Sequence, residues 1–80
     1  MLENERVIAY YEKQSDKFVD EYVIEIDLDI LSNIWIAYEG DPLYYKIYPV
    51  GEGQRGEVEK ILCKKLELEK YDYFLECHSV

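Results

Sequence analysis

The first third of the chain contains two stretches of β-branched and aromatic residues in which apolar and polar positions alternate. They span residues 6–12 and 18–26 and are separated by the polar segment 13–17. Two such stretches joined by a short polar connection are typical of a β-hairpin. In the second stretch Glu21 and Glu25 fall opposite its apolar positions, because successive side chains of a strand point to opposite faces. The hairpin is therefore predicted to have an apolar face and an acidic face.

Two later segments carry apolar residues at helical spacing. The first begins after Asp27, an N-cap residue type, and runs to Gly40, which is placed to end a helix. It is apolar over most of its circumference, so it is either buried or partly covered by another chain. The second segment, residues 57–66, is apolar on one face only. The sequence allows two starts for this second helix. The glycine-containing stretch before residue 57 is either a loop or a first helical turn that begins at Glu52.

The remaining patterned segments are 43–50 and 71–78. The first contains three tyrosines before Pro49, which lacks the N–H of a central strand, and is predicted to be irregular or an edge. The second alternates again and is predicted to form a strand. Asp72, Phe74 and Glu76 lie on one face of that strand.

This order of elements predicts an α+β domain spanning residues 1–80. A small three-stranded antiparallel sheet, in the order strand, strand, helix, helix, strand, would pack its apolar side on the two helices. Eighty residues leave no room for a second domain. If the last strand lies beside the hairpin, the open side of the sheet gathers an acidic and aromatic group: Glu21, Glu25, Asp72, Phe74 and Glu76.

Charge narrows the choice of partner. Eighteen Asp and Glu against nine Lys and Arg give a net charge of -9. The electrostatic field of this negative charge repels nucleic acid. The largest basic cluster, which could bind a phosphate backbone, is only the pair Lys64 and Lys65. The charge favours a basic protein partner, although acidic residues can also serve solubility alone.

The chain carries few groups that suit catalysis or metal binding. His78 is the single histidine and lies near the end of the chain, and Cys63, Cys77 and His78 lack the spacing of a zinc site. The glycine-containing segment 51–56 lacks the Lys-Ser/Thr ending of a phosphate loop. We therefore expect no enzyme, no metal and no cofactor. A small enzyme stays open only if His78 is ordered beside a carboxylate in a cleft.

Location follows from similar reasoning. The first residues are acidic and no apolar signal segment follows them, and the longest nearly apolar stretch, residues 30–38, is far short of the ~20 residues that span a bilayer. The expectation is a cytoplasmic protein without membrane contact. In that setting Cys63 and Cys77 are predicted to be thiols and small buried hydrophobes.

Nine tyrosines in eighty residues are an unusual number. Tyr44, Tyr45 and Tyr48 cluster beside Asp41, and tyrosine supplies rigid amphipathic contact area in protein interfaces. These four residues form a second candidate binding surface. The alternative is that each tyrosine edges a small core and keeps its hydroxyl wet.

Three motifs carry a resemblance over nearly the whole chain: Asp41-Pro-Leu-Tyr44, Tyr48-Pro-Val50 and Tyr71-Asp-Tyr-Phe-Leu-Glu-Cys77. With these motifs the chain resembles a family of small uncharacterised acidic bacterial proteins, and more loosely the immunity proteins of toxin systems. The looser resemblance implies a non-catalytic protein that neutralises a cognate toxin domain, a basic nuclease, through its acidic and aromatic residues. The alternative is a structural or regulatory module that forms a homodimer through its first helix.

Overall fold

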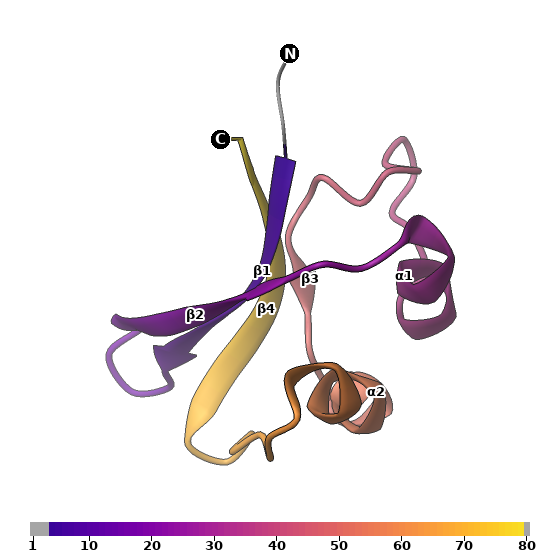
Figure 1. Ribbon diagram of the computed structural model, residues 1–80. Coiled ribbons are helices and arrows are strands. Elements are labelled where there is room, and N and C mark those ends of the chain that lie inside the picture. Colours follow the sequence, from indigo (N-terminus) through magenta and orange to yellow (C-terminus); the bar gives the residue numbers. More distant parts are fainter. Residues whose placement is uncertain (1–3, 80) are drawn as a thin grey trace.

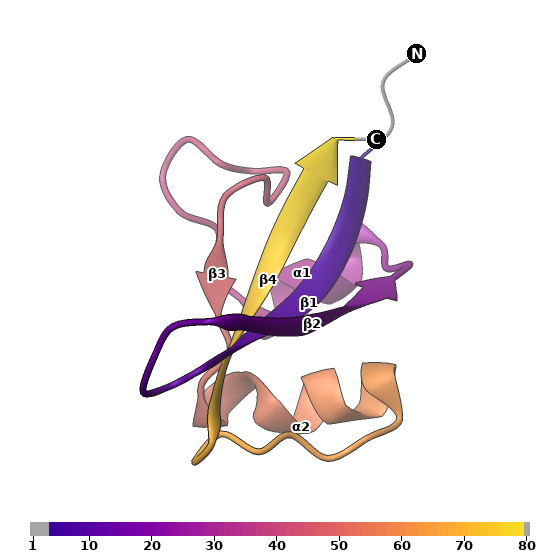
Figure 2. The same ribbon diagram turned by 90° about the vertical axis from the view of Figure 1, so that its left-hand side faces the viewer.

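A computed structural model describes residues 4–79 as a four-stranded antiparallel sheet with two helices (Figure 1). The strand order across the sheet is β2-β1-β4-β3. Both helices lie on one side of the sheet in Figure 1, and Figure 2 views the molecule from the other side. In chain order the elements are β1 (Asn4–Glu12), β2 (Phe18–Ile24), α1 (Leu28–Ile34), β3 (Tyr48–Pro49), α2 (Glu52–Leu62) and β4 (Tyr71–Ser79).

The predicted α+β class and hairpin are confirmed, but the predicted count of three strands is wrong. The fourth strand is β3, whose Tyr48 and Pro49 pair with Leu75 and Phe74 of β4. It lies at the edge of the sheet, where a proline costs no ladder hydrogen bond to a further strand. The prediction of an irregular or edge segment at residues 43–50 is thereby confirmed.

The last strand does return beside the hairpin. β4 pairs antiparallel with the whole of β1, from Asn4 opposite Ser79 to Glu12 opposite Tyr71. The β1–β2 pairing has an irregularity between Tyr10 and Tyr11, after which Tyr11 lies opposite Phe18. β1 and β4 therefore form the centre of the sheet, and every residue on them has a defined neighbour across the strands.

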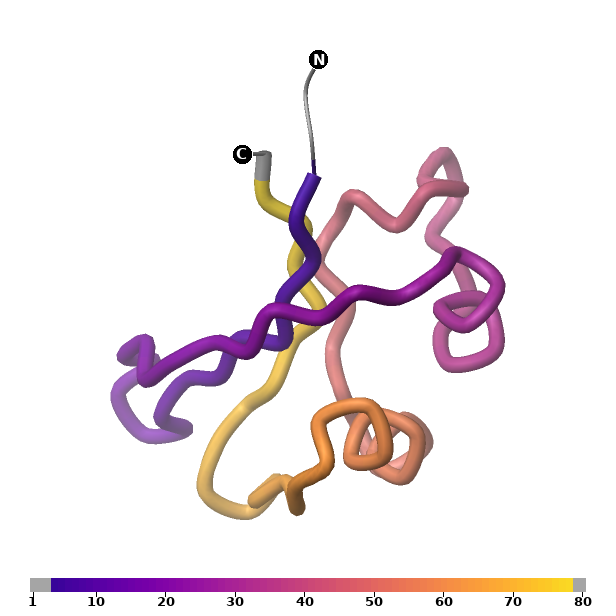
Figure 3. The backbone as a smooth tube through the Cα atoms, viewed as in Figure 1, coloured from indigo at the N-terminus to yellow at the C-terminus, as the bar shows by residue number. Residues whose placement is uncertain are grey.

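α1 ends at Ile34, so the prediction that it continues to Gly40 is wrong. Trp35 is already extended, with φ -125° and ψ 145°. Its indole N–H donates to the Pro49 carbonyl at 2.7 Å, and its own carbonyl accepts from the Tyr44 hydroxyl at 2.7 Å. These tertiary hydrogen bonds override the helical spacing of the following residues. A long irregular segment then connects α1 to β3, and Figure 3 shows its path.

α2 begins at Glu52, the earlier of the two predicted starts, and ends at Leu62 rather than at residue 66. Cys63 stops it by adopting the left-handed conformation with φ 55°. Cys63 is exposed and Cys77 is partly buried, so the prediction that both are small buried hydrophobes is wrong; both are free thiols. Since α2 is the longest helix described, with 11 residues, no helix in this part of the chain can span a membrane.

The core lies between the sheet and the helices. One face of β1 and β4 supplies Ile8 and Leu75, and the helices supply Leu31 and Val58, all of which are fully buried. Tyr48 of β3 is buried among them. Successive side chains of a strand point to opposite faces. The residues directly before and after Ile8 in β1, and before and after Leu75 in β4, therefore point to the side of the sheet away from the helices.

Candidate functional site

The sheet face that carries no helix is the candidate functional surface. The registers place Ala9 between Glu21 and Phe74, and Val7 between Val23 and Glu76. Tyr11 lies between Phe18 and Asp72 in the same way. We call this surface the open face and define it by its larger side chains: Tyr11, Phe18, Glu21, Val23, Asp72, Phe74 and Glu76.

Tyr11 is at the centre of the contacts on the open face. Its ring meets Phe18 and Phe74 edge to face, with centroids 5.7 and 5.8 Å away. Its hydroxyl donates to Oε2 of Glu76 at 2.8 Å. This hydrogen bond to Glu76, with burial as a further cause, raises the pKa of Tyr11 to about 12. The hydroxyl is therefore a neutral donor at physiological pH and holds the carboxylate beside the rings.

A hollow of about 340 Å³ opens on this face. Asp72 has a partner on one oxygen, since Lys13 Nζ is 2.6 Å from its Oδ1. Both oxygens of Glu76 have partners, Oε2 in the Tyr11 hydroxyl and Oε1 in His78 Nε2. Its apolar wall includes Ile47, which precedes the edge strand β3 and is 56% exposed. We call this cavity the acidic-aromatic hollow, and its lining residues are Tyr11, Asp16, Ile47, Asp72, Phe74 and Glu76.

The structure brings together four of the five residues expected on the open side of the sheet. They are Glu21 on β2 and Asp72, Phe74 and Glu76 on β4, the two strands that flank β1. Glu25 is exposed but follows the end of β2 and has no partner in the sheet register. The acidic and aromatic character of the face is thus a property of three paired strands.

The second predicted surface, around Asp41, is largely buried, and this corrects the expectation from sequence. Asp41 and Tyr44 are each 4% exposed and Tyr48 is 1% exposed, so these side chains cannot meet a partner. The reason is that the segment folds onto the core, with the Tyr48 ring stacked on Tyr38 at 4.1 Å. Tyr45 is the exception, with 49% of its surface exposed.

Asp41 organises this segment from inside. Its Oδ1 accepts from the Tyr45 backbone N–H at 2.8 Å, and its Oδ2 accepts from the Lys46 N–H at 3.0 Å and the Tyr48 hydroxyl at 2.6 Å. Burial alone would raise the pKa of Asp41, but the hydrogen bonds from Tyr48 and the two backbone groups outweigh it and hold that pKa below its ordinary value. Asp41 is therefore a charged structural residue.

Sequence reasoning missed several residues of the open face. Alternation along the first strand could have identified Tyr11. Val7, Ala9 and Tyr11 point to one face of the strand, and Ile8 and Tyr10 point to the other. Asp16 and Ile47 lie in a turn and in an irregular segment, where no periodic pattern reports the direction of a side chain. Only the fold brings them to the hollow.

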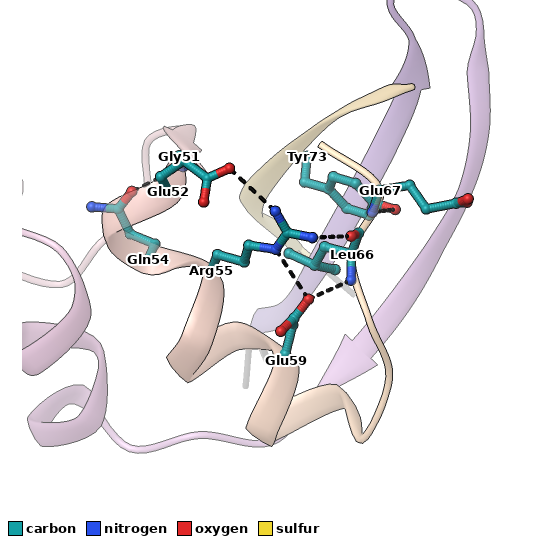
Figure 4. A network of polar contacts seen from close by, with 8 residues as sticks. All are labelled: Gly51, Glu52, Gln54, Arg55, Glu59, Leu66, Glu67 and Tyr73. Atoms are coloured by element: carbon teal, nitrogen blue, oxygen red, sulfur yellow. Dashed lines mark hydrogen bonds and ion pairs between the residues drawn. The ribbon is translucent and has the colours of Figure 1, made fainter. Parts of the chain in front are cut away.

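A second polar network ties α2 to the segment that follows it (Figure 4). Arg55 is within 3.2 Å of Glu52 and 3.3 Å of Glu59, and its Nη2 donates to the Leu66 carbonyl at 2.9 Å. Glu59 accepts the Leu66 backbone N–H at 2.7 Å. The Tyr73 hydroxyl accepts the N–H of Glu67 at 3.2 Å. These contacts hold Leu66 against α2, so we assign this network to stability.

Glu59 makes the network sensitive to pH. The Leu66 N–H lowers its pKa from the ordinary value of 4.5 against the effect of burial, with help from Arg55. A depressed folded pKa adds stability above pH 4.5 that is lost as the pH falls through that folded pKa. We expect Glu59→Gln to lower the Tm by about 2–5 °C at pH 7. Thermal unfolding followed by circular dichroism should show this gap narrowing at pH 3, and a gap of equal size at both pH values would contradict the assignment.

The site has few features of a catalytic centre. The residues that line the hollow include no serine, threonine, cysteine or histidine. His78 Nε2 is 3.1 Å from Oε1 of Glu76, but 43% of the His78 side chain is exposed. Within residues 4–79, no three His, Cys, Asp or Glu side chains come together in a way that could hold a metal ion. The arrangement can present carboxylates and aromatic rings to a binding partner.

Fold and surface together define a small α+β domain with an acidic and aromatic sheet face. The family model described as "Domain of unknown function (DUF7683)" matches residues 5–76, and the chain belongs to this family. The match includes every residue of the open face. It makes no connection to immunity proteins, so that part of the resemblance stays a prediction. Searches of curated proteins and of solved structures found no match.

Proposed function

We propose that this protein is a non-catalytic binding module that takes a basic protein partner on its open face, and that it serves as an immunity protein against a bacterial toxin domain. One observation carries the proposal: β1, β2 and β4 bring Glu21, Asp72 and Glu76 together with three aromatic rings on a face that no helix covers. Carboxylates steer a basic partner to the face, and partly exposed rings supply contact area.

The size of the surface is compatible with a specific complex. A standard interface buries about 800 Å² of each partner. The whole chain exposes 5600 Å², so such an interface needs about a seventh of its surface. Phe18 and Val23 are both more than half exposed on the open face and would be covered in the complex. Burial of this apolar area adds affinity to the electrostatic attraction.

The proposed mode of inhibition is steric and electrostatic. A nuclease holds a phosphate backbone with basic side chains, so an acidic face can occupy the same surface. The net charge of -9 speeds the encounter and makes it sensitive to salt. No catalytic group of the inhibitor is required.

Two variants with the same loss of charge test the proposal. The first carries Glu21→Gln, Asp72→Asn and Glu76→Gln, and the control carries Asp29→Asn, Glu39→Gln and Glu69→Gln at exposed positions outside the open face. Each is co-expressed with the product of the neighbouring reading frame, and the Kd of the purified complex is measured at two salt concentrations. We expect the first variant to bind roughly tenfold or more weakly and with less salt dependence, since charged interface contacts contribute about 1.5 kcal/mol or more.

Three results would reject the proposal. An equal loss in both variants would show that only net charge matters, and no loss in either would place the interface elsewhere. Lack of any complex between the wild-type proteins would remove the toxin partner itself.

The alternative of self-association is supported by a different observation. α1 exposes Leu28 and Ile30, and the residues after it expose Ile36 at 93%. Exposed apolar residues in one segment can take part in a contact between copies. Analytical ultracentrifugation decides the matter, because a mass that stays monomeric at all concentrations rejects a homodimer.

A further inference from the structure

We propose that the acidic-aromatic hollow receives an arginine side chain from the protein partner. This inference rests on the proposed function, because the arginine belongs to the protein partner that the open face binds. The hollow combines the rings of Tyr11 and Phe74 with the carboxylates of Asp16, Asp72 and Glu76. A cationic group that also stacks on aromatic rings fits both parts of this lining.

Asp72 has room for an additional donor. Lys13 engages Oδ1 of Asp72, which leaves Oδ2 for an incoming N–H. Both oxygens of Glu76 are already engaged, by Tyr11 and His78, and its side chain is 12% exposed, so Glu76 adds negative charge to the lining. Because Tyr11 is a fixed donor to Glu76, that carboxylate is already oriented before a partner arrives. The hollow has a volume of about 340 Å³, which holds one long side chain with some waters, since a water takes ~30 Å³.

Arginine suits this lining better than lysine. Its guanidinium is planar, stacks on aromatic faces, donates in two directions and is weakly hydrated. The ammonium of lysine is a strongly hydrated point charge that gains less from the rings. The wall formed by Ile47 and Phe74 offers apolar contact to the methylene part of the side chain.

The arginine must come from another protein. The chain has two arginines of its own, Arg6 and Arg55. Arg6 donates to the Leu43 carbonyl, and Arg55 is held by Glu52, Glu59 and Leu66. A second copy of this chain would have to break these contacts to insert a guanidinium, whereas a basic partner brings arginines of its own.

The test is an NMR titration of the ¹⁵N-labelled full chain at low salt with two capped hexapeptides, one of arginine and one of lysine. The two peptides carry the same charge, so a difference between them reports the guanidinium. We expect the arginine peptide to bind about threefold or more tightly and to shift the amides of residues 11, 47 and 72–76 most strongly. Equal affinities, or shifts spread over the acidic surface without a maximum at the hollow, would overturn the proposal.

Phe74→Leu and Phe18→Leu provide a matched pair of variants. Phe74 lines the hollow, whereas Phe18 is an aromatic residue of the open face that does not line it. The preference for arginine should disappear in Phe74→Leu and persist in Phe18→Leu, with dispersed spectra confirming that both are folded. Loss of the preference in both, or in neither, would overturn the assignment to the hollow.

The experiments distinguish a failure of the arginine site from a failure of the proposed function. Selective arginine binding without a complex with the neighbouring gene product would keep the hollow as an arginine site and reject the toxin partner. A salt-sensitive complex without arginine selectivity would keep the binding module and reject the hollow as the arginine site.

Discussion

Replacing Trp35 by alanine should lower the free energy of unfolding by about 3–5 kcal/mol. Trp35 is 5% exposed and packs in the core, and it joins three segments through its indole N–H to Pro49 and its carbonyl to Tyr44. Truncating a buried tryptophan costs about 3–5 kcal/mol. A chain of this length has a free energy of unfolding of about 4–12 kcal/mol, at ~0.05–0.15 kcal/mol per residue. The substitution therefore removes a large part of the total.

The measurement is urea unfolding followed by far-ultraviolet circular dichroism, since the variant lacks the only tryptophan. The neighbouring Ile36→Ala provides the control, because Ile36 is almost completely exposed and loses little contact. Its free energy of unfolding should change by about 0.5 kcal/mol or less. A Trp35→Ala variant that unfolds at the same urea concentration as Ile36→Ala would refute the role assigned to Trp35.

Asp41→Asn should lower the Tm by about 5–10 °C. Asparagine keeps the size of the side chain but replaces one acceptor oxygen by an NH₂ group. Whichever way the amide is turned, that NH₂ then faces the Tyr45 N–H or the donors of Lys46 and Tyr48. A donor that faces a donor leaves both without a partner in a buried site. The attachment of the segment between α1 and β3 to the core should weaken.

The pH dependence gives a second readout for Asp41. Its pKa in the folded protein is below the ordinary value of 3.8, so its stabilising effect is complete above that value and lost as the pH falls through the folded pKa. The Tm gap between wild type and Asp41→Asn should therefore be largest near neutral pH and shrink toward pH 2. The exposed Asp29→Asn is the matched control and should show no such gap. An unchanged Tm in Asp41→Asn would show that the hydrogen bonds of Asp41 add nothing.

Local patterns predicted the elements better than their ends. The hairpin, the edge segment before Pro49 and the strand that begins at Tyr71 are all present, because alternation with period two is a local property of the chain. The ends of both helices were misplaced. Trp35 leaves the helix to bond with Pro49, and Cys63 adopts a left-handed conformation that periodicity cannot report.

The candidate surfaces show the same division. The alternation along residues 71–78 placed Asp72, Phe74 and Glu76 on one face, and the structure keeps them there. The cluster around Asp41 has polar and aromatic composition typical of a surface, yet its hydrogen bonds are satisfied inside the fold. Composition alone could not distinguish these cases, because a buried polar group is stable when its partners come from the backbone of the same loop.

The sequence by itself determined the α+β class, the acidic charge and the faces of residues in regular strand segments, such as Asp72, Phe74 and Glu76. Each of these depends on composition or on neighbours along the chain. Tertiary structure decided that β4 pairs with β1, which brings Tyr11 beside Phe74 and Glu76. It also decided that Asp16 and Ile47 complete the hollow. These contacts join residues that are far apart in the chain. They form only when the core packs and the strands pair in the correct register, because interactions between sequence neighbours do not favour them.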